Sequence, residues 1–269
     1  SILTEQNIAK MFLAAFVPGI LAAVGYLLAI AIFVRIKPDS GPPTNYVGWR
    51  QRLNLFGQVW QILVIFFLVI GGIYLGWFTP TEGASIGAAG TGIMALFTKG
   101  FNFSDLIDVI KDTAVTSAMI FLVLLGAEFF NSFIALTQIT NELATFVISN
   151  ELSPYLVVFC ILVLYILLGC LMDSLAMILL TIPVFFPIII ELDFGMSIEE
   201  VAIWFGILTL IVVEVGLITP PVGLNVFIIN KMAKNVPISD TFIGVLPFLI
   251  SDLIRVGILF IFPGISLFL

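Results

Sequence analysis

Apolar residues fill long stretches of this chain, and short polar segments separate them. An α-helix needs roughly 20 residues to cross about 30 Å of hydrocarbon at 1.5 Å per residue, and stretches of that length recur. The pattern predicts an all-α, polytopic integral membrane protein. The expected spans, the third of them short, lie at 11–34, 59–78, 84–98, 114–137 and 239–262.

The polar segments orient these spans in the membrane. Segment 35–52 is a linker that holds four of the ten basic residues and three prolines. Basic residues gather in cytoplasmic loops, so this linker is expected in the cytoplasm. Segments 138–152 and 191–200 contain acidic but no basic residues, as expected of loops on the outside. Segment 104–113 sets apolar against acidic residues at helical spacing, which predicts a short interfacial helix.

Residues 153–190 are apolar except at their middle, from Gly169 to Ser174. Two interpretations fit: a re-entrant helical hairpin, or two full spans joined by a short loop. Both leave the chain on the same side of the membrane, so charge does not decide between them. The hairpin is favoured because the polar patch is short for a cytoplasmic loop. In a hairpin Asp173 lies at the tip, inside the membrane; between two spans it is an ordinary loop residue.

The apolar run 201–232 contains a break. Its 32 residues would measure about 48 Å as one straight helix, against about 30 Å of hydrocarbon. Pro220 and Pro221 lack backbone donors and clash with the preceding turn, so a continuous helix is not expected there. Broken backbone at membrane depth needs protein or a water-filled cavity around it, and secondary transporters use such breaks as binding sites.

The break offers groups for both a cation and an anion. Unwound carbonyls from Gly216 to Thr219 and the Thr219 hydroxyl are hard oxygen ligands suited to Na⁺. A half-helix that starts near Val222 would point its N–H groups at an anion, with Gly223 allowing close approach and Asn225 offering an amide. The alternative is a proline kink that only shapes helix packing.

A carboxylate within the apolar run 153–190 is costly, so Asp173 should have a partner. If the hairpin forms, Asp173 and Ser174 can meet the break. The candidate sodium ligands are Gly169, Asp173, Ser174, Gly216 and Thr219. The candidate substrate contacts are Pro220, Pro221, Gly223 and Asn225.

A second Thr-Pro motif lies upstream. Gly76 to Gly83 has the Gly-x-x-Thr-Pro-x-x-Gly spacing of Gly216 to Gly223. One interpretation is a weak internal repeat, as transporters often contain. The favoured one is a helix start, with Thr79 as the N-cap and Glu82 three residues later.

Three further ionisable residues, Glu128, Glu214 and Arg255, lie within apolar segments. Each could line a pathway, pair with another group or reach the interface. Arg255 is most simply a local partner of Asp252, three residues away.

Composition narrows the function classes. The chain is 61% hydrophobic and 10% charged, with a mean hydropathy of +1.23. A net charge of −7 argues against binding nucleic acid or anionic lipid. The absence of histidine excludes histidine metal sites and Ser-His hydrolase chemistry. Cys160 and Cys170 are expected to be small hydrophobic residues rather than a disulfide or metal site. An intramembrane aspartyl hydrolase would need a second aspartate at the depth of Asp173, and none is found.

The motifs Gly-Leu-Ile-Thr-Pro-Pro-Val-Gly-Leu-Asn at 216–225 and Gly-Trp-Phe-Thr-Pro-Thr-Glu-Gly-Ala at 76–84, with the Asp173-containing apolar pair, resemble one family. It is the large membrane subunit of tripartite ATP-independent periplasmic (TRAP) transporters, and the resemblance covers essentially the whole chain. It implies a sodium-coupled importer of the bacterial inner membrane, not an enzyme, that moves by an elevator mechanism. Its substrates would be small organic acids such as C4-dicarboxylates or sialic acid. Its partners would be a periplasmic binding protein and a small membrane subunit.

The resemblance also implies a division of the chain. Residues 1–113 would supply scaffold or arm helices, and 114–262 half of a transport domain, with hairpin 153–190 and broken helix 201–232. Large subunits of the family have two inverted halves, whereas one hairpin and one Thr-Pro-Pro break are found here. The chain therefore looks like the C-terminal half, a fragment or processed product whose partner is the N-terminal half. The alternatives are a stand-alone sodium-coupled anion permease and a structural membrane subunit that does not transport.

Overall fold

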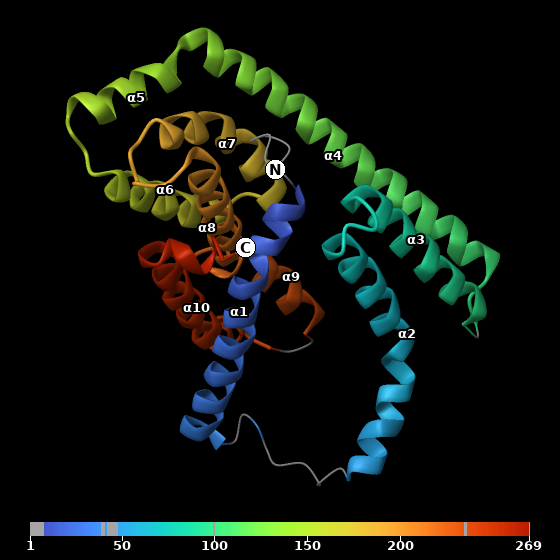
Figure 1. Cartoon of the computed structure of the whole chain (residues 1–269). Coiled ribbons are helices and arrows are strands. Elements are labelled where there is room, and N and C mark those ends of the chain that lie inside the picture. Colours follow the sequence, from blue (N-terminus) through green and yellow to red (C-terminus); the bar gives the residue numbers. More distant parts are fainter. Residues whose placement is uncertain (1–7, 39–40, 42–47, 99, 234–235, 269) are drawn as a thin grey trace. The chain divides into compact units, whose positions relative to one another are not determined.

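The computed structural model describes residues 8–38, 41, 48–98, 100–233 and 236–268 (Figure 1). The chain forms two compact units, one of Ser1–Ser40 with Leu122–Leu269 and the other of Gly41–Phe121. The regular secondary structure of the described residues is entirely helical, which confirms the expected all-α class. In order they are α1 Ile8–Ile36, α2 Trp49–Tyr74, α3 Pro80–Phe97, α4 Phe103–Thr137, α5 Ile139–Ser149, α6 Pro154–Gly169, α7 Ser174–Ile190, α8 Ile198–Ile218, α9 Leu224–Met232, α10 Ile238–Ile261 and a 3₁₀ turn Pro263–Ile265.

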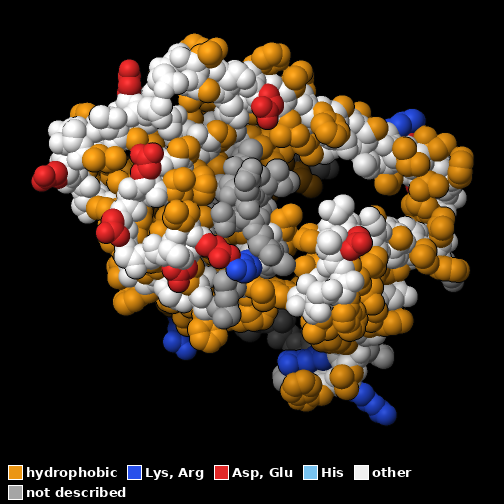
Figure 2. All heavy atoms as spheres, turned by 45° about the horizontal axis from the view of Figure 1, so that its top comes forward, with side chains coloured by type: hydrophobic (Ala, Val, Ile, Leu, Met, Phe, Trp, Pro, Cys, Tyr) orange, Lys and Arg blue, Asp and Glu red, His pale blue; other side chains and the backbone are white. Residues whose placement is uncertain are grey.

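Among the described helices, α1, α4, α8 and α10 are long and apolar enough to cross a membrane. Figure 2 shows hydrophobic side chains over much of this face, with few acidic and basic side chains among them, some of which lie side by side near the centre of the view. Such a surface suits a lipid environment, because a soluble protein seldom exposes large apolar patches.

Two polar segments form helices where the sequence predicts an interfacial helix or a loop. Segments 104–113 and 114–137 form one continuous helix, α4, rather than an interfacial helix and a separate span. No proline or glycine precedes Gly126 in this helix, so nothing ends it between the two segments. Most of the expected outer loop 138–152 is helix α5, which follows a left-handed residue, Gln138, at φ 58°. Its alternation of apolar and polar residues is itself compatible with a short amphipathic helix.

The expected linker 35–52 falls partly on residues 39–40 and 42–47, which lie outside the described residues. At its edges, Arg35 belongs to the last turn of α1. Arg50 and Arg52 belong to the first turn of α2, which begins at Trp49. The span expected at 59–78 is therefore the C-terminal part of a longer helix that ends at Tyr74.

In the unit of Gly41–Phe121, α3 packs on α2 through glycines. A β-carbon on Gly83 would lie 2.9 Å from Cδ1 of Ile73, and one on Gly90 would lie 3.2 Å from Cδ1 of Ile65. Small residues at helical spacing let two membrane helices approach closely. Thr79 caps the start of α3, and Glu82 bonds back to complete a capping box. This confirms the helix-start interpretation of the 76–83 motif.

In the other unit, α6 and α7 are antiparallel neighbours joined by residues 170–173 (Figure 1). The Thr181 hydroxyl of α7 lies 2.9 Å from the Tyr165 hydroxyl of α6, and the Tyr165 ring packs edge-on against Phe185. Tyr165 is fully buried, so these contacts hold α6 and α7 together around this residue.

Helix α8 is the centre of this unit and packs against α1, α6, α7 and α10. Trp204, fully buried on α8, donates its indole N–H to the Leu259 carbonyl of α10 at 2.9 Å. A buried indole needs such an acceptor. The bond ties α8 to the end of α10 at the level of the 191–197 loop.

Helices α1 and α10 share a buried polar contact. Nη2 of Arg255 lies 2.8 Å from Oδ1 of Asp252, which confirms the predicted local pair. Tyr26 of α1 donates its hydroxyl to the other carboxylate oxygen of Asp252 at 2.7 Å, a link that the sequence did not reveal. Only 5% of the Asp252 side chain and 14% of the Arg255 side chain are exposed, so the charges are held inside the packed helices.

Candidate functional site

The site begins where α6 crosses α8 at two glycines. A β-carbon on Gly169 would lie 2.9 Å from the Gly216 Cα, and one on Gly216 would lie 2.7 Å from the Gly169 Cα. The two backbones are therefore in direct contact, and neither position has room for a side chain. The contact brings together two of the predicted sodium ligands, which are 47 positions apart in the sequence.

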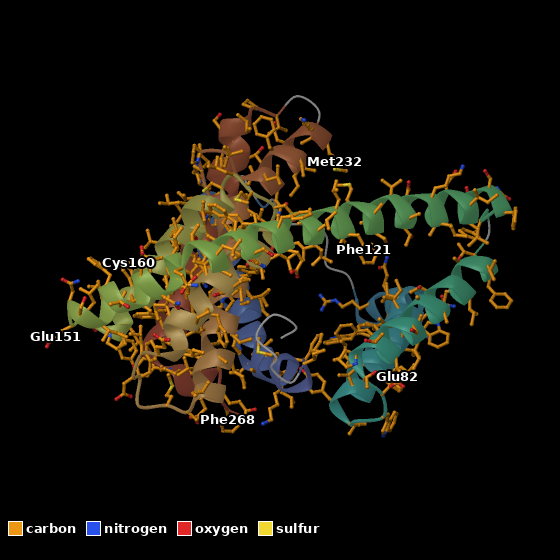
Figure 3. The ribbon with its side chains drawn as sticks, turned by 90° about the horizontal axis from the view of Figure 1, so that it is seen from above. Glu82, Phe121, Glu151, Cys160, Met232 and Phe268 are labelled. Atoms are coloured by element: carbon orange, nitrogen blue, oxygen red, sulfur yellow. The ribbon has the colours of Figure 1, made fainter. Side chains whose placement is uncertain are left out.

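The turn after α6 also touches the break. The Cys170 thiol lies 3.5 Å from the Pro220 carbonyl oxygen and 3.2 Å from the Ile166 carbonyl oxygen. Cys170 is a free, buried cysteine, whereas Cys160 points outward from α6 (Figure 3). Cys170 was not among the predicted site residues, although its place beside Gly169 was the available signal.

The break in 201–232 is confirmed. Helix α8 ends at Ile218, Thr219 is extended at φ −87° and ψ 135°, and the Pro220–Pro221 peptide is cis. Gly223 then adopts φ 55°, a left-handed conformation that glycine tolerates best, and α9 begins at Leu224.

The prolines leave carbonyl oxygens of α8 without helical donors. Thr219 donates its N–H to Gly216 at 3.0 Å and its hydroxyl to Val215 at 2.6 Å. The Leu217 carbonyl would need an N–H from residue 220 or 221, and both are proline. Within the described residues, the Ile218 carbonyl also accepts no backbone hydrogen bond. The C-terminal end of α8 thus presents oxygens that a cation could bind.

Asp173 has a structural task at the other side of the site. Its carboxylate caps α7 by accepting N–H bonds from Leu175 at 3.0 Å and Ala176 at 3.3 Å through one oxygen. Its side chain is exposed and Ser174 is half-buried. In the described part of the chain neither forms a hydrogen bond with the break, so the contact between hairpin and break runs through Gly169 and Cys170.

The predicted substrate contacts lie on the open side of the break. Pro220 and Pro221 are exposed, Asn225 is half-buried and Gly223 is buried. A β-carbon on Gly223 would lie 3.0 Å from the Phe242 ring of α10. Phe242 therefore closes one side of the break, and no local sequence motif predicted this.

The helix ends give the region two electrostatic characters. The carbonyl ends of α6 and α8 carry partial negative charge, whereas the N–H ends of α7 and α9 carry partial positive charge. No group of three or more His, Cys, Asp or Glu side chains that could hold a metal occurs among the described residues. The end of α8 therefore presents partial negative charge to the break, and the start of α9 presents partial positive charge.

The two Thr-Pro motifs differ in local structure. Thr79 begins a helix, whereas Thr219 follows the last residue of one. Of the other ionisable residues in apolar segments, Glu128 on α4 and Glu214 on α8 are exposed.

The sequence matches the family model described as "Tripartite ATP-independent periplasmic transporter, DctM component" over residues 1–265. The chain belongs to the DctM family. This confirms the resemblance to the large membrane subunit of TRAP transporters. It also places the chain in the inner membrane, as a multi-pass protein with the four long apolar helices described above.

Several curated DctM-family relatives align along nearly all of this chain. It is 31% identical to the C4-dicarboxylate TRAP transporter large permease protein DctM of Pseudomonas aeruginosa, over 98% of the chain and 60% of that relative. It is 30% identical to the sialic acid TRAP transporter permease protein SiaT of Haemophilus influenzae, over 99% of the chain and 42% of that relative. The ectoine TRAP transporter large permease protein TeaC of Halomonas elongata is 27% identical, over 100% of the chain and 61% of the relative. The chain spans about 60% or less of the length of these relatives.

Proposed function

We propose that this chain is part of the membrane permease of a secondary importer for small organic acids, driven by a sodium gradient. The observation that carries the proposal is the backbone contact between Gly169 and Gly216, which sets the α6–α7 turn against the proline break. Broken helices facing one another are how secondary transporters form ion and substrate sites. Family membership gives the same class of function, because the relatives are named as transporter permeases. An enzymatic role is accordingly not proposed.

Sodium is proposed as the coupling ion, carried as cargo. Its ligands would be the carbonyl oxygens of Gly169 and Gly216 and those of residues 217–219. The Thr219 hydroxyl oxygen would complete the set. The Thr219 hydroxyl donates its proton to Val215, so its lone pairs remain free to face a cation. Asp173 and Ser174 would contribute charge and a hydroxyl from the α6–α7 turn. These residues supply half of a site.

The substrate class rests on the relatives and on the second half-helix. Proteins named for C4-dicarboxylates, sialic acid and ectoine align along this chain, and the first two of these substrates are organic acids by name. The N–H end of α9, with Pro220, Pro221, Gly223 and Asn225, would meet the carboxylate. The substrate would arrive on a periplasmic binding protein, and a small membrane subunit would assemble with the permease.

The α6–α7 pair is proposed as a re-entrant hairpin. At 16 and 17 residues the helices measure about 24 and 26 Å, short of about 30 Å of hydrocarbon. Helices 114–262 would form half of an elevator-type transport domain and 1–113 its scaffold or arm, with the N-terminal half of the large subunit supplying the facing hairpin.

Two alternative functions can be distinguished from the main proposal by uptake measurements. A stand-alone anion permease would transport without a binding protein. A structural subunit would leave transport unchanged when the 216–225 motif is altered. Both differ from the main proposal in measurable uptake.

The test uses the complete transporter in proteoliposomes, with labelled C4-dicarboxylate, sialic acid and ectoine offered in turn. Uptake that requires both an inward sodium gradient and the loaded binding protein is the expected result. Asp173→Ala and Thr219→Ala should weaken the dependence of uptake on sodium. Unchanged sodium dependence in both variants would remove these residues from the proposed site, and uptake without binding protein would favour the stand-alone permease.

A further inference from the structure

Helix α8 is buried on every side but one. Between Val201 and Leu217 every residue is buried except Gly206, Leu210 and Glu214. These three positions are four residues apart, so they form a single stripe along the helix. Gly206 lies beneath Met11 of α1, since a β-carbon there would come within 2.7 Å of the Met11 Cε. The open part of the stripe is therefore Leu210 and Glu214.

The stripe is narrow because α8 already has neighbours around most of its circumference. Helices α1, α6, α7 and α10 all pack against it within the same unit. What remains exposed of α8 between Val201 and Leu217 is Leu210 and Glu214. The stripe continues through half-buried Ile218 to exposed Pro220, so a helix laid along it would reach the break.

Glu214 makes this stripe chemically specific. It is an exposed carboxylate inside a 21-residue apolar span, and in the described part of the chain it forms no hydrogen bond or ion pair. A charged side chain at that depth is strongly unfavourable against lipid, and such residues are found paired or facing a polar cavity. The two basic residues with described acidic partners near α8, Lys10 and Arg255, are engaged by Glu199 and Asp252.

We infer that Glu214 forms an ion pair with a lysine or arginine on one membrane helix of the large permease outside residues 1–269. That helix would pack along Leu210, Glu214 and Ile218. The occupant is argued from the need of Glu214 for an opposite charge, from the confinement of the exposed positions to one line of α8 and from the greater length of the relatives, of which the chain covers 60% or less. The inference rests on family membership and not on sodium coupling or substrate.

The packing is tested by photo-cross-linking in the complete large permease, assembled with its partners in membranes. A benzophenone amino acid replaces Leu210, which leaves the charge of Glu214 in place. The expected product is an intramolecular cross-link to a peptide outside residues 1–269. The same probe at Leu253, an exposed residue of α10, is the control and should not give that product. Cross-links from Leu210 only to lipid, to the small subunit or to residues 41–121 would overturn the inference.

The charge is tested by substitution in the same complete permease. Glu214→Gln should lower the midpoint of thermal unfolding by roughly 5 °C or more, because it leaves a basic side chain unpaired inside the protein. Glu142→Gln, which neutralises an exposed carboxylate of α5, is the matched control and should shift it little. Glu214→Lys should be rescued by replacing with Glu the basic residue found in the cross-linked helix. Wild-type stability in Glu214→Gln would overturn the ion pair, whether or not the wild type proves to be sodium-driven.

Discussion

Gly169 of α6 and Gly216 of α8 touch through their backbones, with no side chain between them. In a bilayer, where lipid is as apolar as leucine, close packing of small residues is a main source of helix association. The contact also fixes the distance between the α6–α7 turn and the proline break. Its loss should therefore affect both stability and site geometry.

Gly216→Ala, or Gly169→Ala, should destabilise the complete permease by about 1–3 kcal/mol, since the added methyl group overpacks a backbone contact. Gly257→Ala is the control, because a β-carbon on Gly257 of α10 would meet nothing within 4 Å. Alanine should be neutral there or slightly stabilising. Thermal unfolding in detergent checks both, and equal midpoints for Gly216→Ala and Gly257→Ala would contradict the close contact.

Gly223 should tolerate asparagine better than alanine. At φ 55° a residue with a β-carbon is strained, and asparagine visits this region more readily than alanine. We expect Gly223→Ala to cost about 1–2 kcal/mol and to impair uptake. Because the added methyl would meet the Phe242 ring, Phe242→Leu should restore part of the loss. Failure of the second substitution to help would show that backbone strain alone is responsible.

The contributions of Tyr26, Asp252 and Arg255 to stability should be coupled, because the three side chains contact one another between α1 and α10. Asp252→Asn should cost about 3–5 kcal/mol, because it leaves the largely buried Arg255 guanidinium without its counter-charge. Tyr26→Phe removes one hydrogen bond to a charged group and should cost about 1.5–3 kcal/mol. The two losses combined should be less than additive, which a double-mutant cycle on unfolding midpoints measures. Additive losses would mean that Tyr26 and Asp252 act independently.

The start of α3 should be pH-dependent. Hydrogen bonds from the Thr79 backbone N–H and hydroxyl hold the pKa of Glu82 below its usual value. The contribution of Glu82 is therefore present above the unfolded-state pKa and is lost as pH falls through the lowered folded-state pKa. Amide exchange at the α3 N-terminus should speed up at acid pH relative to Glu82→Gln, which lacks this titration. Parallel exchange profiles for the two proteins would rule out the capping carboxylate as the cause.

Local chemistry predicted much of the fold and part of the site. Two adjacent prolines are enough to end α8, and Thr79 with Glu82 three residues later is enough to start α3. The Gly169–Gly216 contact joins residues 47 positions apart, and the sequence around either glycine does not predict which residue it contacts. The same is true of Phe242 over Gly223 and of Tyr26 on Asp252, which are products of tertiary packing.

The boundary errors have a simpler origin. The charges at 104–113 predict an interfacial position, but charged residues on the first turns do not end a helix that meets no proline or glycine. Acidic composition likewise marked 138–152 as a loop, although composition reports the surroundings of a segment better than its backbone conformation.

The unbroken length of α4 has a mechanical consequence. Its 35 residues measure about 52 Å, so a tilt of roughly 55° would be needed to keep them all within 30 Å of hydrocarbon, more than membrane helices usually adopt. The first three turns, with Asp105, Asp108 and Lys111, must therefore stand in the headgroup layer or in water. The C-terminal part of α4 then lies in the membrane, and its N-terminal turns lie in the headgroup layer or in water. A spin label on each end would report the inclination of the helix directly. A small rotation about the membrane-embedded end would produce a larger displacement at the N-terminal end.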